Sequence, residues 1–227
     1  MRIGIISEVQ GNVVALKAVL DKVKNVDLWL HAGNLVGINA FPNETIEICR
    51  ELAKKKKFVS VLGNFDRAVL GYEMDGFEEE EKKAIEWTRE KISEENSDFL
   101  SALPTSVEEA YEGKKLFMVN GSPRDPFGEG INNETNEKYL DLIVNDYDVL
   151  VTGRWLAPLV KKVGKKKKQV VINPGSLGNP TSDKPRAACM YFDFVKGKEL
   201  DGDFEGVEYK FEDVKKENRK NGLAWFI

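Results

Sequence analysis

The chain opens with Arg2-Ile3-Gly4-Ile5-Ile6-Ser7-Glu8-Val9-Gln10-Gly11-Asn12, and this stretch indicates the fold. An apolar run rich in isoleucine ends at a small polar residue, as a buried strand does before a turn. Apolar residues then recur at the spacing of one helix face: Val13, Leu16, Val19, Leu20 and Val23. A strand, a tight turn and an amphipathic helix form the opening unit of an α/β fold. Because such sheets bind ligands beyond the carboxyl ends of their strands, residues 7–12 are the first candidates for chemistry.

Two further strand-loop-helix units follow the first. Residues 26–31 read as a strand that ends at Ala32-Gly33-Asn34-Leu35-Val36-Gly37, and a helix begins near Asn43. A third short strand, over residues 58–62, ends at Gly63-Asn64-Phe65-Asp66. Three such units in succession predict parallel strand pairing with right-handed crossovers.

The rest of the chain mixes helices and strands. Residues 78–103 predict a charged helical segment, and the glutamates at 78–81 are typical of a solvated helix start. The segment is closed by Pro104. The elements expected after it are a strand pair at 106–111 and 115–120, a helix near 134–144, strands at 148–152, 170–173, 187–194 and 206–211, and a final charged helix.

Length and composition favour a globular protein with no membrane span. The 227 residues contain no linker or internal repeat, so we expect a single domain over 1–227. Lys and Arg number 34 against 38 Asp and Glu, and the net charge of -4 argues against a basic nucleic-acid module. No apolar run approaches the ~18 residues of a membrane span, and no signal peptide precedes the first strand. Cys49 and Cys189 lack metal-type spacing, which favours a reduced, cytoplasmic protein.

Two compositional biases bear on environment and chemistry. Lys and Glu are abundant while glutamine occurs only at Gln10 and Gln169, a bias typical of proteins from hot environments. The chain has one histidine, His31, which lies inside the second predicted strand. We therefore expect His31 to be a packed core residue and not a catalyst.

Two segments are candidates for contacts at the protein surface. The four lysines at 165–168 lie in a predicted turn between strands, where solvated lysines discourage edge aggregation. The alternative, a nucleic-acid contact, is not expected. The apolar tail Leu223-Ala224-Trp225-Phe226-Ile227 is expected to dock on the body of the protein, and a contact between subunits of a homo-oligomer is the alternative.

The predicted strand ends carry a series of short motifs. In chain order they read S-E-V-Q-G-N, G-N-L-V-G, G-N-F-D, N-G-S-P-R, G-R-W-L and N-P-G-S. From Met1 to about Tyr191, this series resembles the calcineurin-like metallophosphoesterase superfamily, in its small prokaryotic branch of YfcE-like phosphodiesterases. The family motifs are S-D-x-H-G-N, G-D-x-V-G, G-N-H-D, H-G-S-P-R, G-H-T-H and N-P-G-S. The resemblance implies a four-layer α/β/β/α sandwich, in which two mixed sheets are flanked by helices.

The resemblance also implies a metal site at the strand ends, and the first two motifs depart from it. The Asp and His of the first motif correspond to Glu8 and Gln10. The bridging Asp of the second motif corresponds to Asn34. Of these three positions, only Glu8 keeps an anionic side chain.

The later motifs depart further. The Asn of the third motif is kept as Asn64, while Phe65 stands at the position of the catalytic His. The His of the fourth motif corresponds to Asn120, and the two His of the fifth correspond to Arg154 and Leu156. The resemblance therefore implies that one family ligand is kept, one is changed conservatively, and five are lost together with the catalytic His.

These replacements argue against two-metal chemistry. The family reaction uses two metals roughly 3.5–4 Å apart, which clamp the attacking and leaving oxygens of a phosphate ester. Amide side chains are weak ligands, and Arg154 places a permanent positive charge where a cation binds. We expect no metal cofactor and a catalytically degenerate protein, a pseudoenzyme. The alternative is a weakly active phosphoesterase or phosphodiesterase with no metal or with one weakly bound Mn²⁺ or Mg²⁺ on Glu8, Asn34 and Asn64.

The retained residues still shape a pocket, and its use is open. One hypothesis is a phosphate or nucleotide-like ligand held by Arg124 and Arg154, with Phe65 or Trp155 stacked on a base. The alternative is that these residues serve the fold alone, because tight strand-end turns need glycine. The protein would then act through a protein partner, or through assembly by residues 223–227. No membrane partner is expected.

Overall fold

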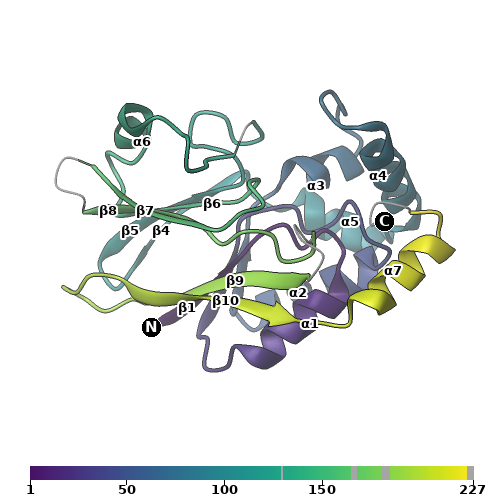
Figure 1. The fold of residues 1–227 in the computed structure, drawn as a ribbon, viewed down its shortest axis with the longest axis horizontal. Coiled ribbons are helices and arrows are strands. Elements are labelled where there is room, and N and C mark those ends of the chain that lie inside the picture. Colours follow the sequence, from purple (N-terminus) through teal and green to yellow (C-terminus); the bar gives the residue numbers. More distant parts are fainter. Residues whose placement is uncertain (129, 165–167, 180–184, 224–227) are drawn as a thin grey trace.

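A computed structural model describes the chain except residues 129, 165–167, 180–184 and 224–227 (Figure 1). Two five-stranded sheets stack face to face, with strand orders β10-β9-β1-β2-β3 and β4-β5-β6-β8-β7. Helices cover the outer faces, so that the α/β fold with two mixed sheets flanked by helices is confirmed. The tail residues 224–227 and the lysines 165–167 lie outside the described residues.

The first sheet is built around the opening strand. β1 pairs in parallel with β2, β2 pairs in parallel with β3, and β9 and β10 add antiparallel strands on the other side of β1. In register, Ile6 lies beside His31, and His31 lies beside Ser60, so the three parallel strands end together. The strands are β1 (Arg2–Ile6), β2 (Leu28–His31), β3 (Phe58–Ser60), β9 (Arg186–Asp193) and β10 (Asp201–Glu208).

The second sheet has the same mixed character. β5, β6 and β8 are parallel neighbours, and the edge strands β4 and β7 are antiparallel to them. The strands are β4 (Ser106–Tyr111), β5 (Lys114–Val119), β6 (Val149–Thr152), β7 (Leu159–Val163) and β8 (Gln169–Asn173). A core of Ile, Val, Leu, Met and Phe side chains from both sheets fills the space between them.

The helices bury their apolar faces on the outer sides of the sheets. α1 contacts β9 and β10, α2 contacts β3, and α6 contacts β7, as the layers in Figure 1 show. The helices are α1 (Val13–Lys22), α2 (Pro42–Lys54), α3 (Asn64–Val69), α4 (Glu79–Lys91), α5 (Glu94–Ser101), α6 (Glu137–Ile143) and α7 (Phe211–Lys220). Two further apolar cores lie under these helices, one on each outer face.

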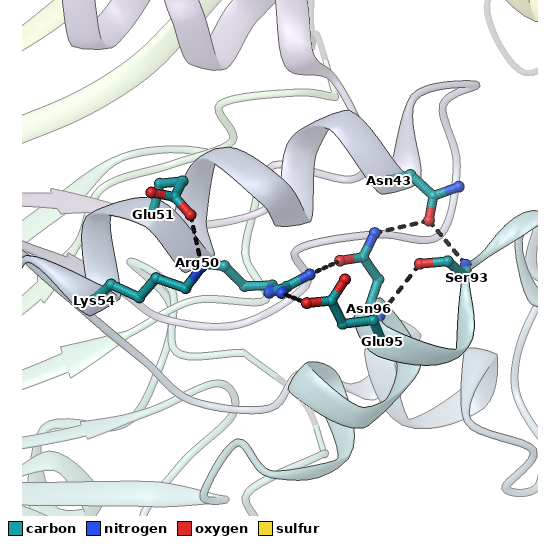
Figure 2. A network of polar contacts seen from close by, with 7 residues as sticks. All are labelled: Asn43, Arg50, Glu51, Lys54, Ser93, Glu95 and Asn96. Atoms are coloured by element: carbon teal, nitrogen blue, oxygen red, sulfur yellow. Dashed lines mark hydrogen bonds and ion pairs between the residues drawn. The ribbon is translucent and has the colours of Figure 1, made fainter.

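A polar network joins α2 to α5 (Figure 2). Oδ1 of Asn43 accepts hydrogen bonds from the backbone N of Ser93 and from Nδ2 of Asn96, both at 2.9 Å. Arg50 donates to Oδ1 of Asn96 at 2.8 Å and forms an ion pair with Glu95. The Ser93 hydroxyl also accepts from the backbone N of Asn96, which caps α5. This network fixes the start of α5 against α2, the helix that contacts β3 of the first sheet.

The structure corrects several expected boundaries. The helical segment predicted at 78–103 is two helices, because Ile92 is extended and Ser93 starts α5 as its N-cap. The strand predicted at 206–211 spans Asp201–Glu208 instead, and Phe211 already begins α7. The structure also contains α3 and the edge strand β7, neither of which the sequence predicted.

The single histidine is a core residue, as predicted. His31 is fully buried, its Nδ1 lies 2.8 Å from the Ser60 hydroxyl, and its ring stacks on Phe58. Burial lowers the pKa of His31 to about 3. In the described part of the apolar tail, Leu223 is buried. Among the described residues, no helix combines the length and the apolar character needed to cross a membrane.

Candidate functional site

The loops that follow six parallel strands converge on Glu8. The backbone joins these loops directly: the amide of Glu8 donates to the carbonyl of Gly33, and the amide of Leu177 donates to the carbonyl of Ser7. The amide of Gly153 donates to the carbonyl of Asn120 in the other sheet. The carboxyl ends of both sheets therefore form one site, as the order of the motifs predicted.

Four N–H donors surround the buried carboxylate of Glu8. Oε1 accepts from Nδ2 of Asn34 at 2.8 Å, from the backbone N of Arg154 at 3.0 Å and from Nδ2 of Asn120 at 3.4 Å. Oε2 accepts from Nε2 of Gln10 at 3.0 Å. Burial raises the pKa of Glu8, and the hydrogen bonds from Gln10, Asn34 and Arg154 oppose this rise. The carboxylate is thus enclosed by donors from four different loops.

The amides also bond to one another across the site. Nδ2 of Asn34 donates to Oδ1 of Asn64 at 2.9 Å, and Oδ1 of Asn34 accepts from the backbone N of Phe65 at 2.9 Å. Nδ2 of Asn120 donates to the carbonyl of Ala32 at 2.8 Å. The five positions Glu8, Gln10, Asn34, Asn64 and Asn120 therefore belong to one connected network, which we call the Glu8 network.

Backbone strain accompanies this network. Glu8, Gln10, Asn34 and Arg154 have φ values of 53°, 54°, 63° and 66°, in the left-handed region that favours glycine. Such conformations cost on the order of 1 kcal/mol each and persist only where the surrounding structure enforces them. The strand-end loops thus hold a demanding geometry although most family ligands are replaced.

Asp66 joins the loop after β2 to the loop after β3. Its carboxylate accepts hydrogen bonds from the backbone N atoms of Asn34, Val36 and Gly63, at 2.9 to 3.0 Å. The residue is fully buried, and burial raises its pKa to about 6 against these hydrogen bonds. Asp66 therefore fixes the loop after β2 to the start of α3.

The aromatic candidates lie in different surroundings. Phe65 is buried and packs edge-on against Phe77 at a centroid distance of 4.7 Å, so its ring is part of the core and does not offer a stacking face. Trp155 is 43% exposed at the surface. Oε1 of Gln10, which is buried near the Phe65 side of the site, has no hydrogen-bond partner among the described residues.

A cavity of about 240 Å³ lies beside the Glu8 network. We call it the arginine cavity, because Arg67 and Arg154 are its two cationic residues. Arg124, which the sequence proposed for this role, is exposed and does not line it. Sequence reasoning missed Arg67, although it stands three residues after Asn64 and so lies on the same side of α3. The cavity is lined by Asn64, Arg67, Glu73, Asp75, Gly76, Phe77, Glu81, Phe127 and Arg154.

Both arginines are held in place by neutral neighbours. The guanidinium of Arg67 lies over the rings of Tyr72 and Phe127, at 4.6 and 4.9 Å from their centroids. Nε of Arg154 donates to the carbonyl of Gly128 at 3.0 Å. The ion pairs of the described residues include neither arginine. Two fixed cations therefore face the same small space.

The donor set of the site is poor in metal ligands. In the described part of the chain, no group of three or more His, Cys, Asp and Glu side chains is placed to hold a metal ion. Around Glu8, the nearest side chains present amide N–H groups, which are hydrogen-bond donors. A single cation on Glu8, Asn34 and Asn64, the alternative left open by the sequence, would have to break these hydrogen bonds.

Comparisons with known proteins agree with the fold. A model of the calcineurin-like phosphoesterase superfamily domain matches residues 1–196. An uncharacterized protein of Methanocaldococcus jannaschii is 34% identical over 233 residues, which span 96% of this chain and 90% of the relative. A metallophosphoesterase of Sphaerobacter thermophilus is 30% identical with a TM-score of 0.80, over 98% of this chain and 94% of the other. A hypothetical protein of Pyrococcus horikoshii shares the fold, with a TM-score of 0.85, 24% identity and the same coverage.

Proposed function

The chain belongs to the calcineurin-like phosphoesterase superfamily, and we propose that it is a pseudoenzyme that binds a small phosphate-bearing molecule in the arginine cavity. Two-metal hydrolysis needs several anionic and imidazole ligands, which balance the charge of the ions and suit transition metals. At the corresponding positions this chain presents Glu8 among side-chain amides. These residues do not fit a two-metal centre.

The Glu8 network supports the loss of metal chemistry in a second way. A cation that reached Glu8 would displace N–H donors of Asn34, Asn120 and the Arg154 backbone. The buried donors would then lose partners, at about 1–3 kcal/mol for each group. The guanidinium of Arg154 adds a charge of the wrong sign for a cation.

The two arginines of the arginine cavity carry the proposal for a ligand. A guanidinium group offers planar N–H donors that match phosphate oxygens in a bidentate manner. Arg67 and Arg154 line one cavity, are fixed by ring and carbonyl contacts, and form no ion pair with the described carboxylates, although the charge of Arg154 also acts on Glu81. A phosphate group is the ligand chemistry that satisfies both.

The carboxylates of the cavity indicate the chemistry of the part of the ligand that is not phosphate. Glu73 and Asp75 are exposed, and Glu81 accepts a hydrogen bond from the backbone N of Glu78 at 2.9 Å. Hydroxyl or amino groups on the body of a phosphate ester would donate hydrogen bonds to these acids, and inorganic phosphate has no such body to reach them. A phosphate monoester with a donor-rich body therefore fits better than phosphate alone.

The experiment is a calorimetric titration of glycerol 3-phosphate into the protein and three variants. Arg67→Ala and Arg154→Ala each remove a charge-assisted hydrogen bond of about 1.5–3 kcal/mol, so we expect at least tenfold weaker binding. Arg154→Ala keeps the backbone N–H that bonds to Glu8. The matched control is Arg124→Ala, an exposed arginine outside the cavity, which should bind as the parent does. Equal affinities for all four proteins would refute the site.

A hydrolysis assay tests the loss of catalysis separately. We expect no turnover of p-nitrophenyl phosphate with or without added Mn²⁺. Turnover that needs Mn²⁺ and disappears in Glu8→Gln would instead establish a working phosphoesterase.

A further inference from the structure

A second cavity lies at the opposite end of the sheets from the Glu8 network. It has a volume of about 370 Å³. β5 begins at Lys114 and β6 at Val149, while Lys168 directly precedes β8. Because these strands are parallel neighbours, their amino ends meet at one edge. The turn between β9 and β10 closes the cavity from the other sheet, at the same end of the molecule in Figure 1.

Lysines dominate the charge of this space, which we call the lysine cavity. Its lining includes Lys114, Lys162, Lys168 and Lys198, against the carboxylates of Asp148 and Glu199. The excess of positive charge is local, because the whole chain carries a net charge of -4. Of the run 165–168, Lys168 is the one member that the structure describes.

Both carboxylates already have partners. Nζ of Lys162 lies 2.8 Å from Oε2 of Glu199, in an ion pair that joins β7 to the turn between β9 and β10. Oδ2 of Asp148 accepts from the backbone N of Lys115 at 2.8 Å. The ion pairs of the described residues do not include Lys114, Lys168 or Lys198. Three ammonium groups of the described residues are therefore outside ion pairs and can approach a bound anion, although the charge of Lys114 also acts on Glu199.

The floor of the cavity is apolar. Val149 is buried, and Val170 and Leu200 are half-buried beside the core that fills the space between the sheets. Lysine side chains bring point charges with three donors each, which suit phosphate oxygens in several orientations. A space with an apolar floor and a cationic rim matches a molecule with a compact organic body and a multiply charged anionic group.

We propose that the lysine cavity is a second ligand site, and that it takes a nucleoside di- or triphosphate or a small organic anion of similar charge. Its volume falls within the ~300–1,000 Å³ of small-molecule pockets. Nucleic acid is disfavoured, because its binding calls for an extended basic surface and the chain is acidic overall. The site shares no lining residue with the arginine cavity, so it does not depend on the function proposed above.

The test is a titration of ADP, without divalent cations, into the protein and four single variants. Lys114→Met and Lys198→Met remove ammonium groups that form no ion pair with the described carboxylates, and each should weaken binding at least tenfold. Glu199→Gln removes the partner of Lys162 and should tighten binding severalfold, an effect that a merely structural role would not produce. The matched control is Lys17→Met on α1, an exposed lysine far along the chain from the cavity, which should bind ADP as the parent does.

Three outcomes would overturn this proposal. One is an equal loss of affinity in Lys17→Met and Lys114→Met, which would indicate nonspecific charge attraction. Another is tighter binding of a single-stranded oligonucleotide that competes with ADP, which would indicate a nucleic-acid surface. The third is loss of ADP binding in Arg154→Ala, which would place the nucleotide in the arginine cavity. Retention of ADP binding by Arg154→Ala, together with its loss of glycerol 3-phosphate, would support both sites independently.

Discussion

Nδ2 of Asn34 lies 2.8 Å from Oε1 of Glu8 and 2.9 Å from Oδ1 of Asn64, so one amide donates both of its hydrogens within the site. Its own Oδ1 accepts from the backbone N of Phe65 at 2.9 Å. An aspartate at this position could accept the last of these bonds and could donate neither of the first two. Asn34 thus holds together loops that follow three strands of the first sheet.

The exchange Asn34→Asp should therefore be strongly destabilising. It keeps the shape of the side chain, removes two donated hydrogen bonds and places a second carboxyl against buried Glu8. Leaving a buried charge without its partner costs about 3–5 kcal/mol. We expect a loss of about 3 kcal/mol in the free energy of unfolding at pH 8, measured by urea denaturation.

The matched control is Asn133→Asp, at an exposed asparagine. It adds the same charge in solvent and should change stability by less than about 0.5 kcal/mol. Equal losses in the two variants would contradict the role of Asn34. Added Mn²⁺ should raise the melting temperature of Asn34→Asp more than that of the parent, because the variant restores a second carboxylate beside Glu8.

Gly63 should not tolerate a methyl group. A Cβ at this position would lie 2.0 Å from Oδ1 and 2.2 Å from N of Asn34. Because φ at Gly63 is -98°, alanine fits the backbone and the cost of Gly63→Ala is steric. We expect a loss of about 3 kcal/mol, at the upper end for overpacked sites.

Gly76→Ala provides the comparison for Gly63→Ala. At Gly76 φ is +80° and no atom lies within 4 Å of the added Cβ, so only backbone strain of about 1 kcal/mol applies. Comparing the losses of stability of the two variants by thermal unfolding distinguishes steric crowding at Gly63 from backbone strain at Gly76. A smaller loss in Gly63→Ala than in Gly76→Ala would show that the loop after β2 yields to the methyl group.

The apolar runs predicted the central strands because burial on both faces leaves a strong signal. Ile3 to Ile6 is such a run, and β1 (Arg2–Ile6) coincides with it. The edge strand β7 carries Lys161 and Lys162 between buried Leu159 and Val163, so its short pattern gave no comparable signal. The break between α4 and α5 depends on Ser93 as a cap, which lies within an otherwise continuous helical pattern.

The sequence motifs predicted where the candidate site lies, but they predicted only part of its set of cationic side chains. The strand-end motifs located Glu8 and Asn34, because polar loops after parallel strands meet at one edge. Arg154 could be placed by its motif, and it does line the cavity. Arg67 was missed because the bounds of α3 were not predicted, and the structure places the exposed side chain of Arg124 outside the lining of the cavity.

Both cysteines should be inert in the folded protein. Cys49 and Cys189 are buried, and burial raises the pKa of both thiols, to about 12 for Cys189. Because the thiolate is the reactive form, a chromogenic disulfide reagent at pH 8 should label neither residue until denaturant is added. Labelling at the rate of a free thiol in the native protein would contradict this packing.

The buried histidine should make the protein lose stability in mild acid. In the unfolded chain, His31 titrates at its ordinary pKa of about 6.5, whereas burial lowers the pKa in the folded state to about 3. Between these values the unfolded state binds the additional proton, so the free energy of unfolding falls as pH decreases. The contribution is fully present above pH ~6.5 and amounts to at most about 5 kcal/mol.

The substitution His31→Asn isolates the contribution of histidine protonation to the pH dependence of stability. An asparagine amide can reach the Ser60 hydroxyl as Nδ1 of His31 does, and it does not take up a proton in this pH range. Burial raises the pKa of Asp66 to about 6, so between its ordinary pKa and pH 6 this residue makes the free energy of unfolding rise as pH falls. Asp66 is present in both proteins, so its effect cancels in their difference. The difference between the two urea-derived stability curves from pH 7 to pH 4 should therefore shrink as pH falls, with the parent losing more. Parallel curves would mean that His31 accepts a proton in the folded state, and that Nε2, which has no hydrogen-bond partner among the described residues, can reach solvent or a counter-charge.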